Sequence, residues 1–138
     1  MDRPPRIGLI KDYFFHHAER EVQQHTEEAV QRLSLGGAQV EEVSLPPSFA
    51  TTHDIQWIIQ RAEMAAYHEE LFRKRPDEYT ATFRQQIETG MLVPALHYLQ
   101  AQRIRRNYRR EMETLARMWD VLLTPTLNAP APLSVMLE

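Results

Sequence analysis

The sequence predicts an α/β fold in which several helices, one of them long, cover a small sheet. The N-terminal region has the pattern of a strand, a helix and a second strand within about 40 residues, the spacing of a right-handed βαβ unit with parallel strands. A long helical stretch follows and ends in a short apolar run at residues 121–123, which is typical of a strand covered on both faces. With 138 residues in total, the chain is predicted to form a single domain over residues 1–138.

The βαβ unit rests on three local patterns. Ile7, Leu9 and Ile10 predict the first strand, and residues 11–17 are expected to form a loop with several aromatic side chains. The helix is predicted from an apolar stripe with gaps of three and four residues, which comprises Ala18, Val22, His25, Ala29 and Leu33. His25 in this stripe is expected to be a partly buried packing residue.

Glycines and prolines mark the ends of these elements. Gly36 and Gly37 can adopt the positive φ that ends helices. Val40, Val43 and Leu45 then predict the second strand, which Pro46 and Pro47 terminate.

Helical periodicity dominates the chain from Asp54 onward. One predicted helix carries an apolar face formed by Ile55, Ile58, Ala62, Ala65 and Ala66. Pro76 separates it from a shorter helix, which is predicted over residues 78–88 and ends at Gly90.

The longest helix is predicted to open at Pro94, because proline is tolerated in a first turn. Its apolar stripe repeats every three or four residues and comprises Ala101, Ile104, Tyr108, Met112, Leu115 and Trp119. Four arginines are expected on the opposite, solvated side: Arg103, Arg106, Arg110 and Arg117. Arg105 lies about 40° from the start of the stripe and is expected to lean inward.

Composition excludes several functional classes. The net charge of −3 and the pI near 6.1 predict no general attraction to nucleic acid or to a membrane surface. No apolar run approaches the roughly 20 residues of a membrane span, so a cytoplasmic location is expected. There is no cysteine, which excludes disulfides, thiolate metal sites and cysteine nucleophiles.

No catalytic site is visible in the residue inventory. The serines at positions 34, 44, 48 and 134 do not lie in glycine-rich loops, and the only lysines are Lys11 and Lys74. The string HEEL at residues 68–71 lacks the second histidine that a zinc-protease helix needs, because Phe72 stands at that position. The sequence therefore predicts no catalytic residue, no metal site and no cofactor.

One segment still has the pattern of an active-site loop. The string DVLLTPT at residues 120–126 predicts a buried strand that continues into a rigid loop with Pro130 and Pro132. Loops of this kind are where sheets present catalytic and binding residues.

Seven motifs follow one another along the chain: RIGLIKDYF at 6–14, GAQVEEVSLP at 37–46, AEMAAYHEEL at 62–71, RQQIETG at 84–90, Tyr98 with Ala101 and Arg105, DVLLTPT at 120–126, and the loop from Pro130 to Pro132. In this order they resemble the C-terminal part of the amidase signature family, which includes amidases and the A subunits of glutamyl-tRNA amidotransferases. The resemblance spans nearly the whole chain and implies a partial amidase fold, with a mixed sheet wrapped by helices.

The resemblance also implies where the chemistry lies. Members of the family cleave amide bonds with a serine, a second serine in a cis peptide and a lysine, all in the N-terminal half that this chain does not match. The substrate-pocket candidates on this chain are Glu63, His68, Arg84, Thr124 and Thr126. Arg105 is expected to be structural, with Glu63, Glu88 or Asp120 as its buried partner.

Two functions remain open at this point. The first is the C-terminal portion of an amidase that acts on a small amide substrate in the complete enzyme and is inactive alone. The alternative is a non-catalytic interaction module that associates with itself or with a chain carrying the missing half. Binding of nucleic acid through the arginine-rich helix is disfavoured, because Glu111 and Glu113 interrupt the positive charge.

Overall fold

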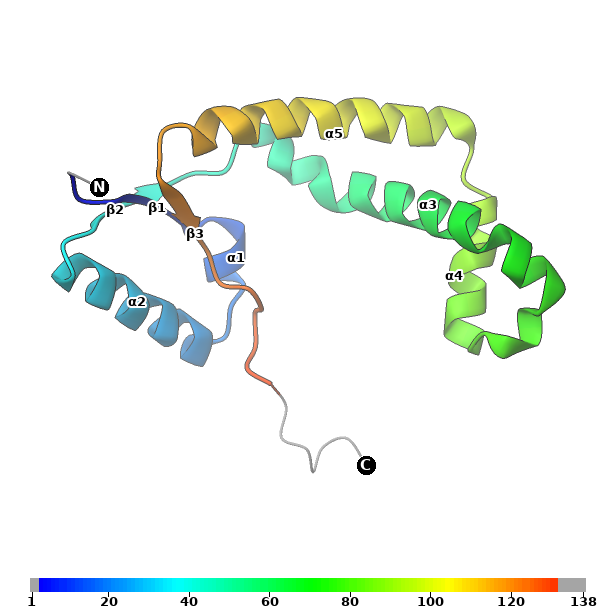
Figure 1. The fold of residues 1–138 in the computed structure, drawn as a ribbon, viewed down its shortest axis with the longest axis horizontal. Coiled ribbons are helices and arrows are strands. Elements are labelled where there is room, and N and C mark those ends of the chain that lie inside the picture. The colour runs from blue at the N-terminus through cyan, green and yellow to red at the C-terminus, as the bar shows by residue number, and fades with distance from the viewer. Residues whose placement is uncertain (1–2, 132–138) are drawn as a thin grey trace. The chain divides into compact units, whose positions relative to one another are not determined.

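The structure, a computed structural model, describes residues 3–131 (Figure 1). The elements follow one another as β1 (Arg6–Ile10), α1 (Tyr13–His16), α2 (Arg20–Leu35), β2 (Gln39–Val43), the 3₁₀ turn η1 (Pro47–Thr51), α3 (Thr52–Lys74), the 3₁₀ turn η2 (Pro76–Glu78), α4 (Ala81–Met91), α5 (Ala95–Ala116) and β3 (Val121–Leu123). The chain divides into two compact units. The described residues of the first are 3–45 and 112–131, and the second is Pro46–Glu111. The single domain over residues 1–138 stays a prediction, and Pro132 lies outside the described residues.

The first unit contains a three-stranded parallel sheet in the order β2-β1-β3. Ile7 of β1 stands opposite Val40 on one side and opposite Val121 on the other, so β1 is the central strand (Figure 1). The predicted α/β class, the βαβ unit and all three strands are confirmed. The antiparallel strands of a mixed sheet are not among the strands that the structure describes.

Burial is concentrated on β1. Ile7, Leu9 and Ile10 are 5%, 4% and 4% exposed, as expected for a central strand covered on both faces. At Gly8 an added Cβ would lie 2.9 Å from Leu122 and 3.0 Å from Trp119. Only a glycine therefore leaves room for β3 and Trp119 at this position.

Asp120 joins the start of β3 to the start of β1. Its carboxylate accepts two hydrogen bonds of 2.7 Å from the guanidinium of Arg3 and one of 2.8 Å from the backbone N–H of Arg6. In return, the backbone N–H of Asp120 donates to the carbonyl of Arg6 at 2.9 Å. The Arg3 hydrogen bonds and the Arg6 N–H lower the pKa of Asp120 to about 2.

Two expectations for the first unit are wrong. Part of the predicted loop, Tyr13–His16, forms the short helix α1, because one helical turn brings Phe15 into the core, where it is 8% exposed. His25 is an exposed residue whose side chain keeps 69% of its accessible surface and lies near Glu21 and Glu28. The apolar stripe of α2 is only partly covered, and none of the residues of this helix is fully buried.

The second unit is helical. Its core contains Ile55 and Ile59 of α3 and Ala101 of α5, with Ile58 and Tyr98 packed against them. The helix α3 has 23 residues and α5 has 22, so the helix predicted to be the longest is one residue shorter than α3. The shorter helix α4 begins at Ala81 rather than at residue 78, because η2 occupies residues 76–78 and Thr80 caps α4.

The contact between α3 and α4 is unusually close at Gly90. A Cβ at this position would lie 2.0 Å from the carbonyl oxygen of Arg61 and 2.8 Å from the Cβ of Ala65. Next to it, Ile87 is fully buried at 0% exposure. The two helices therefore approach backbone to backbone at a position where no side chain fits.

No helix within residues 3–131 is both long and apolar enough to cross a membrane.

Candidate functional site

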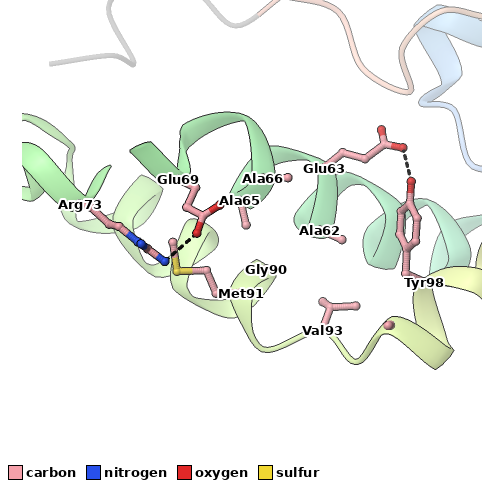
Figure 2. A pocket seen from close by; sticks show the side chains of 11 residues that line it. Ala62, Glu63, Ala65, Ala66, Glu69, Arg73, Gly90, Met91, Val93 and Tyr98 are labelled. Atoms are coloured by element: carbon pink, nitrogen blue, oxygen red, sulfur yellow. Dashed lines mark hydrogen bonds and ion pairs between the residues drawn. The ribbon is translucent and has the colours of Figure 1, made fainter. Parts of the chain in front are cut away.

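A groove on the second unit lies between α3 and the segment that joins α4 to α5. It has a volume of about 630 Å³ and is lined by Ala62, Glu63, Ala65, Ala66, Glu69, Arg73, Gly90, Met91, Val93, Ala95 and Tyr98. We call it the α3–α4 groove. Several lining residues are small, because α3 and α4 approach closely at Gly90. The polar lining residues Glu63 and Glu69 each contact a neighbouring side chain. Figure 2 shows Glu69 turned toward Arg73, with which it pairs at 2.7 Å.

Glu63 lies at one end of this groove and is held by two groups of α5. Its carboxylate accepts a hydrogen bond of 3.0 Å from the Tyr98 hydroxyl, the contact drawn in Figure 2, and one of 3.2 Å from the Gln102 amide. The Gln102 amide also donates to the Tyr98 oxygen at 3.0 Å. These three side chains form a connected network that orients a carboxylate at the groove.

Glu63 also borders a second groove, between α3 and α5. This groove has a volume of about 410 Å³ and is lined by Thr52, Ile55, Gln56, Ile59, Gln60, Glu63, Arg105 and Tyr108. We call it the α3–α5 groove. Partial burial raises the pKa of Tyr108 above its usual value, so the phenol is protonated at neutral pH. It can therefore donate a hydrogen bond to an occupant.

His68 lies away from both grooves, in an aromatic cluster. Its Nδ1 is 3.0 Å from the Tyr79 hydroxyl, and its ring meets those of Tyr79 and Phe83 edge to face. The rings of Tyr79 and Phe83 are stacked. The cluster ties α3 to η2 and α4. His68 also borders a separate shallow hollow with Tyr67.

Arg84 is a half-buried residue of α4 whose guanidinium pairs with Asp77 at 3.2 Å. It lines neither of the two grooves. Of the predicted pocket residues in the second unit, only Glu63 lies in these grooves, and a pocket role for His68 and Arg84 stays a prediction.

Thr124 and Thr126 belong to the first unit. Thr126 lines a small cavity of about 150 Å³, together with Tyr13, Phe14, His17, Pro125, Leu127 and Asn128. The Oγ1 of Thr124 is buried and has no hydrogen-bond partner within the described part of the chain. A buried hydroxyl without a partner is costly, so the residue after β3 offers an unused donor and acceptor.

The expectation of an inward-leaning, partnered Arg105 is wrong. Arg105 is exposed, and its guanidinium makes no hydrogen bond or ion pair with any of residues 3–131. None of the three candidate carboxylates contacts Arg105, and two of them accept hydrogen bonds from other residues. Glu63 is bound by Tyr98 and Gln102, Asp120 is bound by Arg3 and Arg6, and Glu88 is exposed without contacting Arg105.

The sequence did not single out Gln102 or Tyr108 as site residues. Tyr98 and Gln102 are four residues apart and therefore on one helical face. Such a pair of donors spaced four apart could have been noticed, but its acceptor Glu63 lies on another helix, and only the packing of α3 against α5 reveals it.

A known family accounts for the arrangement. The family model described as Amidase matches residues 1–138. The chain belongs to the amidase family. The predicted resemblance to its C-terminal part is confirmed.

Several curated proteins resemble this amidase-family chain. An amidase of Pseudomonas putida is 37% identical over 126 residues, which cover 91% of this chain and 27% of that protein. The 1-carboxybiuret hydrolase subunit AtzE of Pseudomonas sp. strain ADP is 30% identical, with 92% of this chain and 27% of AtzE covered. This chain thus spans between a quarter and a third of the length of the curated relatives it matches.

Solved structures of amidases share the fold. One crystal structure of an amidase superposes with a TM-score of 0.85 at 26% identity, covering 94% of this chain and 30% of that one. A structure from a vestigial protein complex of an s-triazine catabolic enzyme gives a TM-score of 0.80 at 29% identity, covering 94% and 27%. In each case this chain therefore corresponds to part of a larger chain.

Among the described residues of this amidase-family chain, no group of three or more potential ligands is arranged to hold a metal ion. The Ser48 hydroxyl donates to the carboxylate of Glu111, which also accepts from Asn107. A serine with only a shared carboxylate beside it lacks the base and the backbone oxyanion donors of a nucleophile. That the chain holds no catalytic residue stays a prediction.

Proposed function

We propose that residues 1–138 act as the C-terminal portion of an amidase, a hydrolase of carbon–nitrogen amide bonds, and that helices α3 to α5 form a wall of its substrate pocket. The observation that supports this most is the α3–α4 groove, where Glu63 is fixed by Tyr98 and Gln102 above a floor of alanines. An oriented carboxylate and small apolar side chains suit the recognition of a small amide substrate.

The residue inventory supports a division of labour. Amide hydrolysis needs a nucleophile, a base and donors for the oxyanion, and Ser48, the serine of the second unit, already donates to Glu111. Lys11 is engaged by Glu42, and Lys74 pairs with Glu70 at 2.5 Å on the far end of α3. In the proposed enzyme the catalytic serines and lysine are therefore supplied by residues outside 1–138, and residues 1–138 alone are inactive.

An amide-hydrolysis assay tests this proposal. Purified residues 1–138 would be incubated with a panel of small aliphatic and aromatic amides, with ammonia or amine release as the signal and the Pseudomonas putida amidase as the positive control. We expect release at the buffer rate. Turnover that survives repurification and is abolished in Ser48→Ala would show that the chain carries its own nucleophile and would refute the proposal.

A second candidate function is association with a chain that carries the catalytic half. It is favoured by exposed leucines between the end of α4 and the first turns of α5, since Leu92, Leu96 and Leu99 are 81%, 63% and 54% exposed. It is also favoured by the outer edge of β3, which no described strand pairs. Unpaired strand edges and apolar patches are the usual marks of an interface. Sedimentation analysis of the chain alone should show self-association that grows with concentration, and a monodisperse monomer throughout would count against an exposed interface.

A further inference from the structure

Glu63 brings an unbalanced negative charge to the α3–α4 groove. Both of its hydrogen bonds, from the Tyr98 hydroxyl and the Gln102 amide, reach Oε1, so Oε2 has no hydrogen bond or ion pair among the described residues. The other charged lining residues, Glu69 and Arg73, pair with each other at 2.7 Å. The groove therefore keeps one carboxylate oxygen that is held in place but not engaged.

The positive charges near Glu63 do not neutralise it in the described structure. Arg73 follows ten residues later on the same helix, which places its Cα about 15 Å away at the helical rise per residue. Arg105 stands one turn beyond Gln102 on α5, but it lines the α3–α5 groove and makes no ion pair with Glu63. A cation is therefore attracted by Oε2 in the α3–α4 groove, whereas Arg105 would repel it in the α3–α5 groove.

The rest of the α3–α4 groove suits an occupant with an apolar body. Besides the Tyr98 ring, its lining consists of small and aliphatic side chains: Ala62, Ala65, Ala66, Met91, Val93 and Ala95. A volume of about 630 Å³ is typical of sites for small ligands, which are mostly apolar with a few placed polar groups. Because the Tyr98 hydroxyl points to Glu63 (Figure 2), a cation on Oε2 also lies near an aromatic ring, which attracts it.

We propose that the α3–α4 groove binds a small amide that carries a second, protonated amino group on a short apolar chain, and that this ammonium contacts Oε2 of Glu63. Tyr98 and Gln102 are positioning residues, because they hold Oε1 and so fix the direction of Oε2. A substrate class is thereby named for the pocket wall, so the inference rests on the proposed function. A neutral amide of the same shape gains nothing from Oε2, and an anionic amide is repelled by it.

Binding of matched amides to residues 1–138 tests this inference without any turnover. The probes are δ-aminovaleramide, which carries the ammonium, hexanamide, in which a methyl group replaces it, and glutaramate, which ends in a carboxylate. Affinities would be measured by NMR titration at low salt. We expect δ-aminovaleramide to bind about fivefold more tightly than hexanamide, the upper range for a solvent-exposed charge pair, and glutaramate to bind least. The preference should shrink as salt is added.

Three variants assign the preference to Glu63. Glu63→Gln should abolish it and leave the affinity for hexanamide unchanged, because only the charge is lost. Glu88→Gln is the matched control, since Glu88 is an exposed residue of α4 that lines neither groove, and its loss changes the net charge equally without affecting the preference. Tyr98→Phe keeps the ring but removes a donor to Oε1, so the preference should fall partway while hexanamide binds as before. Thermal melts would verify that each variant is folded.

Several results would overturn the inference. Equal affinity of the wild-type chain for δ-aminovaleramide and hexanamide is one, and a preference that survives in Glu63→Gln is another. NMR shifts that map to Tyr108 instead of Ala66 would place the ammonium in the α3–α5 groove, which also contradicts it. A preference seen only in Arg105→Gln would mean that Arg105 occupies Oε2 in the wild-type chain, so that no ligand is needed there.

These outcomes are distinct from a failure of the proposed function. A groove that does not discriminate by charge can still be the wall of an amidase pocket that accepts neutral amides. If none of the three amides binds, the inference is overturned, while the proposed function is still decided by the turnover assay. Amide turnover by residues 1–138 alone would refute the proposed function and leave the measured charge preference as it stands.

Discussion

Asp120 shows how one side chain can organise the start of a sheet. Its carboxylate accepts hydrogen bonds from two guanidinium nitrogens of Arg3 and from the backbone N–H of Arg6. These donors lie at and just before the N-terminal end of β1. Bidentate arginine–carboxylate pairs are stronger and more directional than single contacts. The start of β3 is therefore fixed against β1 before any side chain of β3 itself contributes.

The first prediction concerns this carboxylate and pH. Folding lowers the pKa of Asp120 from 3.8 to about 2, so the charged form stabilises the fold above pH 3.8 and this contribution is lost as the pH falls toward 2. Asp120→Asn should lower the melting temperature near neutral pH, and the difference from wild type should shrink to nothing near pH 2. Thermal melts of both proteins across this range check it.

Asp77→Asn is the control for that experiment, because Asp77 is 95% exposed at its side chain and holds a single longer contact to Arg84. Its effect should be small at every pH. If Asp120→Asn has a pH-independent effect, the carboxylate charge is not what stabilises the strand pair.

Arg105 marks the limit of reasoning about single residues. Its angle from the apolar stripe predicted an inward lean, yet at the structural level it is an exposed residue beside a groove. Helical periodicity gives the direction of a side chain to within part of a turn. It does not tell whether the space it points to is filled, and in this chain that space is open.

Among the helices and strands, regular patterns were predicted well and short turns were not. The apolar run of β1 is buried as predicted, so burial and sequence agree on this strand. The positions of β3 and α5 were predicted as well, but the expected burial of β3 is wrong, because Val121 is 53% exposed, and only Ala101 of the α5 stripe is buried. The short elements α1, η1 and η2 depend on local backbone hydrogen bonds, and η1 and η2 also begin at a proline. A pattern of three to five residues cannot distinguish such turns from loops.

The candidate site was predictable only in part for a related reason. Glu63, Tyr98 and Gln102 could each be noticed in the sequence, but their network joins α3 to α5. Thr124 and Thr126 lie in the other compact unit from Glu63, His68 and Arg84. Positions that a motif names together along the chain become one site only through packing, which sequence periodicity does not encode.

The second prediction tests the close contact of α3 with α4. Gly90→Ala would place a Cβ 2.0 Å from the Arg61 carbonyl, so the helices must separate, and we expect a loss of about 1–3 kcal/mol in the free energy of unfolding. Urea denaturation measures it. Ile87 should become accessible to solvent in the same variant, because it is buried at this contact.

Gly37→Ala provides the comparison. Gly37 has a φ of +94° and nothing within 4 Å of an added Cβ, so its cost of about 1 kcal/mol comes from backbone strain alone. If the two substitutions cost the same and Ile87 stays protected, the α3–α4 contact is looser than described.

The third prediction concerns the start of α4. The Thr80 hydroxyl accepts a hydrogen bond of 3.3 Å from the Phe83 N–H, so Thr80→Ala should cost about 1 kcal/mol of stability. Hydrogen exchange at the Phe83 amide should accelerate, whereas Thr80→Ser should leave it unchanged. Unaltered exchange in Thr80→Ala would mean that the cap is not formed in solution.

At the scale of the whole molecule, the chain forms two compact units, whereas the sequence predicts a single domain. Each unit has its own buried residues, with Ile7 and Leu9 in the first and Ile55, Ile59 and Ile87 in the second. The helix α5 is continuous across the boundary between them, since it runs from Ala95 to Ala116. A continuous helix offers a physical route for cooperativity between the units.

The fourth prediction follows from that continuity. If residues 1–138 fold as one domain, Asp120→Asn and Gly90→Ala should each accelerate the slowest hydrogen exchange in both units, because these amides exchange through global unfolding. Exchange monitored peptide by peptide would show this. Acceleration confined to the unit that carries the substitution would instead mean that the two units unfold independently.

The central position of β1 has a consequence for the order of folding. Its partner β2 follows after α1 and α2, whereas its other partner β3 comes from the far end of the described chain. During synthesis the βαβ unit can assemble while β3 is still within the ribosome, which leaves one edge of β1 open until the helical residues between β2 and β3 have been made. In the nascent chain, the open edge of β1 can therefore pair with a wrong strand, although β1 is buried in the folded protein. A chaperone would have the most effect during the interval before β3 emerges.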